Sequence, residues 1–431
     1  MDFAGALAFL DDHVNLEKLL ASERLEPPTL DRMRRLAELM GDPHRQYQVV
    51  HVTGTNGKTS TSRLIAGLLE EMGLSVGLYT SPHLESITER MMWNGEAISE
   101  EAFAEVVGSL EQIVPLLGPD VPSYFELLTA AAFGWFADIA VDVAVVEVGL
   151  GGTWDATNIV ESTVAVITTV GLDHTEFLGP TRAHIAREKA GIVKPRSHLV
   201  LGETDPHLRE AFVSRGPAAV WTREDDYGCV RNRLAHRGRL LDIRTPGASY
   251  DDLYLALHGA HQGDNAATAL AAVEAFFAEP VPEPRVQEAF ARVRVPGRLE
   301  VVGHQPLVIL DGVKNREGAE ASSLAMAEEF RAANRVIVVG LLRGRPPEEV
   351  LDALEVRGAK LVVTCPAPSP RTVPAEELAA VATAMGAVAE VAPSVSAAMQ
   401  RAHETAAPDD IIIVTGSLYV VGEARRLAGV G

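Results

Sequence analysis

Cysteine, aromatic side chains and long apolar runs are all scarce in this chain, and each scarcity excludes a class of protein. The two cysteines, Cys229 and Cys365, are too few and too far apart for a disulfide framework or a cysteine-based zinc site. We interpret both as thiols of a reducing, cytoplasmic compartment. No run of about eighteen uncharged apolar residues occurs, so we expect no membrane-spanning helix and no membrane partner.

Positively charged residues are also fewer than negatively charged ones. Lysine and arginine number 38 against 59 aspartates and glutamates, for a formal net charge of -21. Nonspecific nucleic-acid binding needs a basic footprint, so we expect no nucleic-acid partner. An acidic surface still permits a phosphate ligand, because loop amides and a few lysines can form a local positive pocket. The first residues lack a basic segment and include Asp11 and Asp12, so no signal peptide is expected there.

The length of 431 residues exceeds the size at which a single core keeps growing, which predicts two domains. Strand-like apolar runs alternate with helical patterns, which favours the α/β class. We predict an N-terminal P-loop ATPase-like domain with a mostly parallel sheet over 1–296. A smaller, Rossmann-like α/β domain is expected over 297–431. Residues 220–258 lose the alternation and suggest appended antiparallel strands, and the proline-rich stretch 280–297 is the predicted hinge.

A glycine-bracketed turn follows an early apolar run. The stretch 49–60 reads V-V-H-V-T-G-T-N-G-K-T-S, and a helical pattern continues from Thr61 to Leu69. A glycine loop between a strand and a helix N-terminus aims backbone amides at a phosphate, with Lys58 as a point charge. The usual P-loop has a glycine where Val52 stands, so the match is to a shorter variant. We predict nucleotide phosphate binding by Gly54, Thr55, Asn56, Gly57, Lys58, Thr59 and Ser60.

Polar residues stand at or just beyond the ends of apolar strands, where open α/β sheets bind ligands. Glu147 ends one such run, and a buried carboxylate is costly unless it is paired or bound to a cation. Beside a phosphate loop it suits Mg²⁺, with the hydroxyls of Thr59 or Ser60 and of Ser81 completing the oxygen ligands. A salt bridge at the sheet edge is the alternative for Glu147. His174, after the next strand, is a weaker signal, because a lone histidine there is more often a hydrogen-bonded structural residue than a ligand.

Three further residues have two interpretations each. Lys189 either faces a ligand or is a surface helix lysine beside a glutamate. Arg298 follows a Pro-Gly pair at the expected domain junction, and Asp311 follows an apolar strand. Both positions suit a nucleotide held between two domains, and both equally suit a surface ion pair.

Taken in order along nearly the whole chain, these motifs resemble the folylpolyglutamate synthase/dihydrofolate synthase family, a branch of the Mur ligase superfamily. The segments that carry the resemblance include the glycine loop, the strand-end motifs and the C-terminal T-G-S-L-Y. In chain order they are 33–36, 41–43, 51–58, 79–84, 89–90, 94–95, 125–126, 147–152, 155–158, 173–174, 178–179, 185–192, 261–266, 296–298 and 415–419.

The resemblance implies an ATP-dependent amide ligase that uses Mg²⁺. The γ-phosphate of ATP would pass to a carboxylate, and the amine of L-glutamate would attack the acyl phosphate. The implied acid is dihydropteroate, a reduced folate, or both, and we expect the enzyme to act as a monomer. By resemblance, the catalytic residues are Lys58, Glu147, His174 and Lys189. The metal ligands would be Ser81, Glu147, His174 and Lys189, the last as a carbamate.

The resemblance also assigns the substrate contacts. Gln262 and Asn265 would face adenine, Arg298 the phosphates and Asp311 the ribose. The remaining substrate-binding residues would lie near the pterin or the transferred groups; they are Pro82, His83, Phe125, Asp155 and Lys314.

Departures from the family pattern bear on the substrates. The family usually has histidine and proline where this chain has Lys314 and Arg316, in the loop that helps to place the phosphoryl group or the glutamate. An arginine commonly stands where Thr153-Trp154 follow the glycines, and Thr59 replaces a glycine, as in the Mur ligases. Nucleotide and magnesium binding are therefore the firmer expectations, and the acid and amino acid the more open ones.

Three alternatives remain beside the main hypothesis. One is a paralogous ligase that acts on another acid and amino acid. A Mur ligase proper is disfavoured, because only some 48 residues precede the phosphate loop. A nucleotide-binding protein without turnover is disfavoured because Glu147, His174 and Lys189 are all retained.

Overall fold

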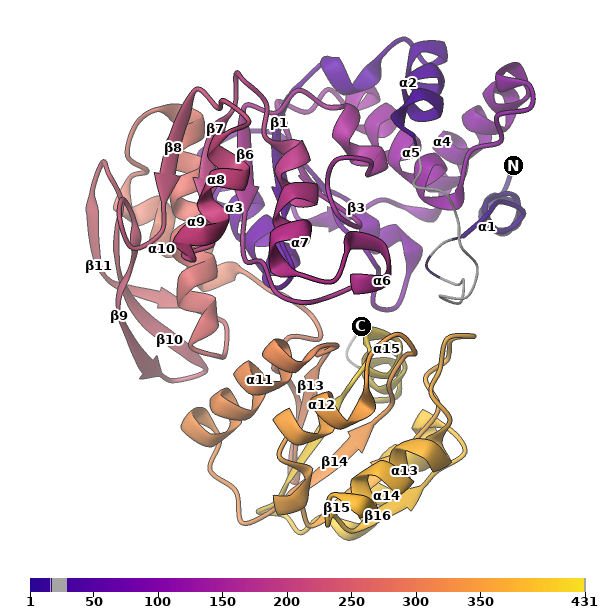
Figure 1. Ribbon diagram of the computed structural model, residues 1–431, viewed down its shortest axis with the longest axis vertical. Coiled ribbons are helices and arrows are strands. Elements are labelled where there is room, and N and C mark those ends of the chain that lie inside the picture. Colours follow the sequence, from indigo (N-terminus) through magenta and orange to yellow (C-terminus); the bar gives the residue numbers. More distant parts are fainter. Residues whose placement is uncertain (16, 18–28, 430–431) are drawn as a thin grey trace.

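The computed structural model describes residues 1–15, 17 and 29–429, which form two bodies with the chain passing once between them (Figure 1). An eight-stranded and a three-stranded sheet are built from residues up to Leu255. A six-stranded sheet contains every later strand of the described chain, beginning at Glu300. The α/β class expected from the sequence is confirmed, with a mostly parallel large sheet and a second α/β sheet in the C-terminal region.

The large sheet has the strand order β4-β3-β2-β5-β1-β6-β7-β8. All neighbours from β2 to β8 pair in parallel, while β3 and β4 are antiparallel additions at one edge. Strand β5 is buried along its whole length, which explains its unbroken apolar run up to Glu147. The strands are β1 Gln48–Thr53, β2 Val76–Tyr79, β3 Met91–Trp93, β4 Glu96–Ala97, β5 Val143–Glu147, β6 Val164–Ile167, β7 His198–Leu201 and β8 Ala219–Thr222.

Helices cover both faces of this sheet, because successive side chains of a strand point to opposite faces. Val50 and Val52 of β1 pack with α3 Lys58–Glu71, α9 His261–Phe277 and α10 Glu283–Arg292. Val49 packs on the other face. The helices of that face are α1 Phe3–Asp11, α2 Leu30–Leu39, α4 Glu100–Ile113, α5 Tyr124–Asp138, α7 Arg182–Lys189 and α8 Pro206–Val213.

The predictions for the flanking segments have mixed outcomes. The apolar stripe on α2 is confirmed, since Met33, Leu36 and Ala37 are buried; the part of the expected N-terminal helical region that falls on 16 and 18–28 lies outside the described residues. The antiparallel strands expected after residue 220 are also confirmed. They are β9 Gly228–Ala235, β10 Gly238–Arg244 and β11 Ser249–Leu255, in the order β11-β10-β9.

The predicted hinge over 280–297 is wrong for most of its length. Residues Glu283–Arg292 form α10, with Pro284 in the first turn and with Val286, Ala289 and Phe290 buried in the core. Proline is tolerated at the start of a helix, where its missing amide has no partner to lose. The prolines therefore mark a helix start, and the connection between the sheets shortens to residues 293–299. Our domain boundary at 296/297 falls within that connection.

The small sheet has the order β12-β13-β17-β14-β15-β16, parallel except for β12 at one edge. The four central strands were predicted; the half-buried edge strands β12 and β16 were not. The strands are β12 Glu300–His304, β13 Leu307–Asp311, β14 Arg335–Val339, β15 Leu361–Thr364, β16 Ala389–Val391 and β17 Ile411–Thr415. Helices α11 Arg316–Glu329, α12 Pro347–Ala353 and α13 Ala375–Ala384 cover one face, and α14 Val395–Thr405 and α15 Leu418–Leu427 the other.

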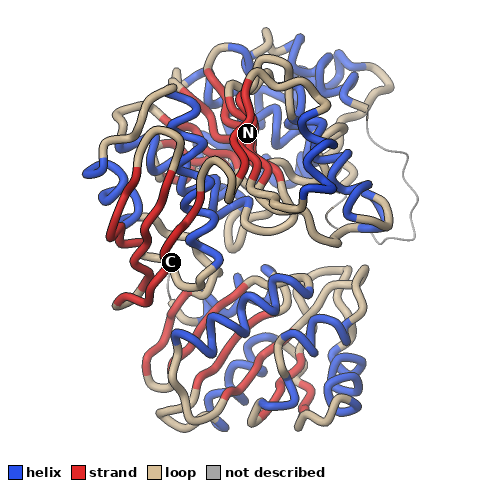
Figure 2. The backbone as a smooth tube through the Cα atoms, turned by 60° about the vertical axis from the view of Figure 1, so that its left-hand side comes forward, coloured by secondary structure: helices blue, strands red, loops and turns tan. Residues whose placement is uncertain are grey.

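The two bodies meet along the carboxyl ends of their parallel strands, and helices cover both faces of the eight-stranded and of the six-stranded sheet (Figure 2). This arrangement brings β1, β5 and β6 opposite the loop between β13 and α11. In the described part of the chain, no helix has both the length and the hydropathy needed to cross a bilayer.

Candidate functional site

A cavity of about 580 Å³ lies between the two bodies. We call the body with the eight-stranded and three-stranded sheets the large domain, and the body with the six-stranded sheet the small domain. The walls of the cavity include the glycine loop after β1, the ends of β2 and β5, and the first turn of α9. The small domain contributes the β13–α11 loop and the start of α15. The volume falls in the range of small-molecule sites, roughly 300–1,000 Å³.

Two glycines give the phosphate loop its shape. Gly54 has φ +157 and Gly57 has φ +84, a backbone region that side chains rarely adopt. A Cβ on Gly54 would lie 1.8 Å from Thr168 Oγ1, and one on Gly57 would lie 2.4 Å from Asn265 Oδ1. Helix α3 starts immediately afterwards at Lys58. The loop therefore presents a helix N-terminus to the cleft, which fits a phosphate group.

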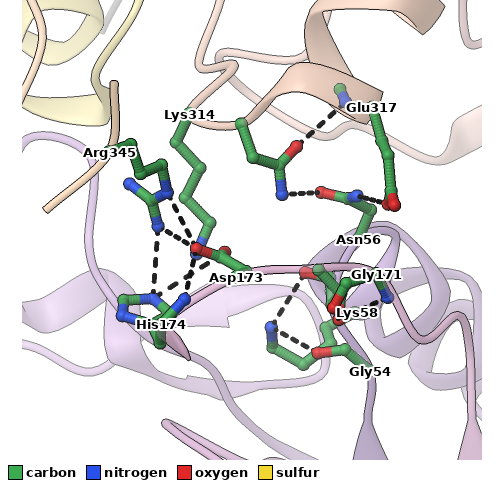
Figure 3. A network of polar contacts seen from close by, with 12 residues as sticks. Gly54, Asn56, Lys58, Gly171, Asp173, His174, Lys314, Glu317 and Arg345 are labelled. Atoms are coloured by element: carbon green, nitrogen blue, oxygen red, sulfur yellow. Dashed lines mark hydrogen bonds and ion pairs between the residues drawn. The ribbon is translucent and has the colours of Figure 1, made fainter. Parts of the chain in front are cut away.

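The side chains of the loop are held by hydrogen bonds to both domains (Figure 3). Lys58 Nζ donates to the Gly54 carbonyl oxygen at 3.0 Å. Asn56 reaches the small domain: its Nδ2 donates to Glu317 Oε2 at 3.2 Å, and its Oδ1 accepts from Asn315 Nδ2 at 3.1 Å. The side chain of Asn315 in turn caps α11 by accepting from the Gly318 amide. The glycine loop is thus tied to the first turn of α11.

Glu147 ends β5 inside the cleft and is almost fully buried. Both of its carboxylate oxygens accept from Thr59 Oγ1, at 3.1 and 3.0 Å. Burial raises the pKa of Glu147, and Lys58 and the Thr59 hydroxyl oppose this effect. Ser81, which follows β2, lines the same cavity. A salt bridge at the sheet edge, the alternative for Glu147, does not occur among the described ion pairs.

The donors around Glu147 fit Mg²⁺. They are a carboxylate and the hydroxyls of Thr59 and Ser81, all hard oxygen ligands. Among the described residues, no cluster of three histidine, cysteine or acidic side chains could hold a metal alone. Magnesium characteristically completes its shell with water and nucleotide phosphates, so a sparse protein contribution beside a phosphate loop matches that ion.

His174 lines the same cavity as Glu147 and has a left-handed backbone conformation, φ +51. Burial lowers its pKa well below the usual value, which favours the neutral imidazole that a metal ion can bind. Its neighbour Asp173 was not predicted as a site residue. Asp173 Oδ1 accepts from Arg345 Nε at 2.8 Å, and its Oδ2 lies 3.4 Å from Lys314 Nζ. Burial alone would raise the pKa of Asp173, but the surrounding cations hold it well below its usual range.

Lys189 is buried behind the glycine loop, so its interpretation as a surface lysine is wrong. Its Nζ donates to the Gly54 carbonyl oxygen at 2.9 Å, and no ion pair to it occurs among the described residues. Burial, with help from Lys58, lowers the pKa of Lys189 well below the usual value. It borders a small second cavity together with Lys58, His174 and Lys314. Burial therefore favours the neutral amine of Lys189 over its ammonium form.

The residues expected around the nucleotide line the main cavity, except for Gly54, which borders the small second cavity. Gln262 and Asn265 stand in the first turn of α9, where Asn265 Nδ2 donates to Gln262 Oε1 at 2.9 Å. Gln262 Nε2 lies 3.5 Å from the hydroxyl of Ser60. On the small domain, Arg298 Nη1 donates to the Gly312 carbonyl oxygen at 2.6 Å. Asp311, at the end of β13, is buried beside it.

The residues expected near the pterin divide into two groups. Pro82, Phe125 and Asp155 line the main cavity. His83 is not among its lining residues; its Nδ1 accepts from Arg90 Nε at 3.0 Å. The cavity also has aromatic walls that the sequence did not single out as a site; these side chains are Trp154, Phe177 and Tyr419.

Two family models match the chain, one on each side of the connection between the two domains. Residues 52–273 match the Mur ligase middle domain and residues 297–418 match the Mur ligase glutamate ligase domain. The chain is 36% identical to the dihydrofolate synthase/folylpolyglutamate synthase of Mycobacterium tuberculosis, over 93% of this chain and 90% of that protein. It is 31% identical to the protein of the same name from Bacillus subtilis, over 93% and 94%.

Solved structures agree over the full length. The structure of Mycobacterium tuberculosis folylpolyglutamate synthase with ADP has a TM-score of 0.93 at 36% identity, covering 100% of this chain and 98% of that one. The structure of E. coli FolC with DHPP and ADP has a TM-score of 0.87 at 29% identity, covering 100% and 98%.

Fold and site together define a P-loop ligase of the Mur type, whose nucleotide cleft is completed by a second α/β domain. Within that class, the chain belongs to the folylpolyglutamate synthase/dihydrofolate synthase family.

Proposed function

We propose that this protein is an ATP-dependent amide ligase that joins L-glutamate to the carboxylate of a folate-type acid. The observation that carries the proposal is the composition of one cavity. A glycine phosphate loop, the buried carboxylate Glu147 and the loops of the glutamate ligase domain all face it. The relatives named dihydrofolate synthase/folylpolyglutamate synthase, and the neighbours solved with ADP, support the same conclusion.

The first step transfers the γ-phosphoryl group of ATP to an oxygen of the acid. The bond between the γ-phosphorus and the bridging oxygen breaks, ADP leaves, and an acyl phosphate forms. The loop amides and Lys58 hold the phosphates, and Arg298 approaches them from the small domain. Bound Mg²⁺ would neutralise charge on the transferring group. We propose that Ser81, Glu147 and His174 hold that ion, with Thr59 beside them.

The second step forms the amide. The amine of L-glutamate attacks the carbonyl carbon, the C–N bond forms, and the C–O bond to phosphate breaks with its electron pair leaving on the phosphate. The nitrogen releases its proton to solvent. Acyl phosphates hydrolyse, so a cavity enclosed by two domains protects the intermediate from water.

We also propose that Lys189 carries a carbamate. An unprotonated amine adds to carbon dioxide, loses a proton, and becomes a carboxylate-like oxygen donor. Burial and the absence of an ion pair among the described residues favour that amine form. The new oxygens would add negative charge to a small cavity that Lys58, His174 and Lys314 line together with one carboxylate, that of Asp173.

The pterin end of the acid would lie against Phe125 and Asp155, near Pro82. Asp155 is buried and accepts from the Leu150 amide at 2.9 Å. The same site would accept dihydropteroate or a reduced folate, since both present a pterin at one end and a carboxylate to be activated at the other. We propose a monomer acting in the cytoplasm, in keeping with the two free cysteines.

The test measures phosphate release and product mass with ATP, Mg²⁺ and a panel of acids and amino acids. Release that requires both L-glutamate and either dihydropteroate or tetrahydrofolate, with one new amide per phosphate, is the expected result. Turnover only with other pairs would assign the chain to a paralogous ligase. Tight ATP binding without turnover for any pair would overturn the proposed activity.

A further inference from the structure

A chain of buried hydrogen bonds runs from the interior of the large sheet to the cavity. His51 lies on β1, between β5 and β6, and its Nε2 is 2.9 Å from Oγ1 of Thr157. The hydroxyl of Thr157 donates to Oδ1 of Asp155, which lines the cavity. His51 and Thr157 are completely buried and do not line it, and Asp155 is 3% exposed. The two ligation steps use neither His51 nor Thr157.

The proton on each of these hydrogen bonds can be assigned from the partners. The hydroxyl of Thr157 has one proton, and an ionised Asp155 can only accept, so the proton points to Asp155. The hydroxyl oxygen then accepts from an Nε2–H of His51. Within the described chain, Nδ1 of His51 has no hydrogen-bond partner. Orphaned buried N–H groups are rarer in proteins than unpartnered acceptors, which also favours the Nε2–H tautomer. Burial lowers the pKa of His51 to about 3, which favours the neutral ring.

Donation from His51 through Thr157 favours the carboxylate form of Asp155. Burial raises the pKa of Asp155, and the largest opposing contribution comes from the hydroxyl of Thr157. Oδ1 accepts from both the amide and the hydroxyl of Thr157, and Oδ2 accepts from the Leu150 amide at 2.9 Å. A carboxylate oxygen has two lone pairs, so Oδ1 is fully used and Oδ2 is the oxygen left for a ligand. Asp155 therefore offers the cavity an acceptor and no donor.

A pterin ring carries the complementary groups. Its pyrimidine part has a ring N–H and an amino group side by side, and both are donors. The aromatic ring of Phe125 lines the same cavity and packs on Gly149, where a Cβ would lie 2.5 Å from Cζ of Phe125. An aromatic face and the carboxylate of Asp155 thus lie at the two ends of the short loop 149–155. This combination suits a flat heterocycle with N–H donors on its edge.

We propose that His51 and Thr157 are positioning residues for the folate-type acid: they hold Asp155 as an acceptor-only carboxylate whose Oδ2 takes an N–H donor of the pterin ring. This inference rests on the proposed ligase function and deepens it. Recognition of the ring depends on two buried residues that never touch it, because together they fix the ionisation and the orientation of the one that does.

The first test replaces the hydroxyl of Thr157 with a methyl group. The assay uses the full chain with ATP, Mg²⁺, L-glutamate and the pterin-containing acid that the unaltered enzyme ligates. In Thr157→Val, the KM for that acid should rise about tenfold, because Asp155 loses its hydroxyl donor. The kcat and the KM for ATP should change less than about threefold, as for a group that acts in binding. Thr157→Ser keeps the hydroxyl and should restore the KM to within about threefold.

Thr222→Val is the matched control. Thr222 is also a buried threonine, its hydroxyl has no partner among the described residues, and it does not line the cavity. This variant should keep the normal KM for the acid. An unchanged KM in Thr157→Val would overturn the proposal, as would an equal rise in Thr222→Val or a loss confined to kcat.

A ligand without the pterin provides a second control. The parts of dihydropteroate and of a folate that lack the pterin are 4-aminobenzoate and 4-aminobenzoylglutamate. The inhibition constant of the matching fragment should change less than about twofold in Thr157→Val, since the fragment has no donor for Asp155. A rise equal to that of the KM for the whole acid would show a general distortion of the site and would overturn the proposal.

The second test concerns the histidine. His51→Gln keeps an N–H donor at about the reach of Nε2, whereas His51→Met has no donor. The KM for the acid should rise about three- to tenfold in His51→Met and stay within about twofold in His51→Gln. Nitrogen NMR of the unaltered protein, with the His51 signals assigned by their loss in His51→Gln, should show the Nε2–H tautomer at neutral pH. An Nδ1–H tautomer, or an equal rise in KM in both variants, would contradict the assigned direction.

Thermal unfolding of each variant separates a binding defect from a folding defect. If Thr157→Val fails to fold, the comparison of His51→Met with His51→Gln and the tautomer measurement decide. The two levels of inference fail separately. If the unaltered enzyme turns over no folate-type acid with glutamate, the proposed function fails. If it does, and Thr157→Val keeps the normal KM for the acid, only the role of His51 and Thr157 fails.

Discussion

The two edges that enclose the cavity are built in different ways. On the large domain, the phosphate loop is fixed by backbone: Gly54 and Gly57 adopt conformations closed to other residues, and α3 begins at Lys58. On the small domain, the loops reach across with long side chains, as Lys314 and Arg345 do toward Asp173. The nucleotide half of the site is thus preformed, whereas the acceptor half depends on where the small domain lies. Perturbing each edge should therefore have different consequences.

The largest effect should come from the preformed edge. Lys58→Met removes the charge beside the phosphates, and kcat should fall about 100- to 1,000-fold, as for other fixed groups that stabilise a transition state. Phosphate release measures the loss, and calorimetry measures ATP binding. Lys194→Met, which removes a lysine that does not line the cavity, is the control and should keep near-normal activity. Normal turnover by Lys58→Met would refute the preformed phosphate site.

Much of that edge was predictable because its signal is local. The glycine loop, the apolar strands and Glu147 can each be recognised from a short continuous stretch of sequence, and all were predicted. The predicted hinge over 280–297 was wrong because a proline such as Pro284 suits the start of a helix as well as a linker. Only the packing of Phe290 in the core decides between a helix and a linker here. Asp173 and Arg345 had no comparable signal. Their partnership joins residues 172 positions apart, and it exists only once the domains meet.

The second prediction concerns Lys189, which is buried behind the phosphate loop. We expect Lys189→Ala to lose about 100-fold in kcat, because the proposed carbamate could no longer form and supply an oxygen donor beside the phosphates. Acetate or propionate should restore part of the activity by supplying a carboxylate in the vacated space. Full activity in the variant, or no rescue by any short-chain acid, would count against the carbamate.

Catalysis should depend on pH through the small-domain edge of the cavity, which includes Lys314. Burial lowers the pKa of Lys314 to about 8, against its interaction with Asp173, so the ammonium is lost as pH rises through that value. We expect kcat/KM for glutamate to fall up to about tenfold from pH 7 to 9. Lys314→Arg stays charged and should remove this component of the profile. An identical decline in both proteins would place the titration elsewhere.

The same lysine has an opposite effect on stability. Its folded pKa lies below its unfolded value, so the unfolded chain binds more protons between about pH 8 and pH 10.5. The contribution of Lys314 to the free energy of unfolding therefore rises with pH across this window. Denaturant unfolding of the unaltered protein and of Lys314→Met at several pH values measures the difference. A difference that shrinks with pH would contradict the assigned burial.

The smallest effect on catalysis should come from a second contact between the domains. Arg239 of β10 is buried, and its Nη1 lies 3.0 Å from Glu328 and 2.7 Å from Glu329, at the end of α11. Arg239→Met should leave KM for ATP unchanged, because none of these side chains lines the cavity. Its free energy of unfolding should fall by about 3 kcal/mol, since Glu329 stays buried with one partner fewer. Steady-state kinetics measures the KM for ATP, and calorimetric unfolding measures the change in stability.

The most direct test of the chemistry follows one oxygen atom. The folate-type acid is labelled with ¹⁸O in its reacting carboxylate, and the phosphate released during ligation is examined by mass spectrometry. Activation as an acyl phosphate predicts one ¹⁸O in each phosphate formed, because the bond that breaks in the second step leaves the acid oxygen on phosphorus. Phosphate released without the label, while the amide still forms, would contradict the account.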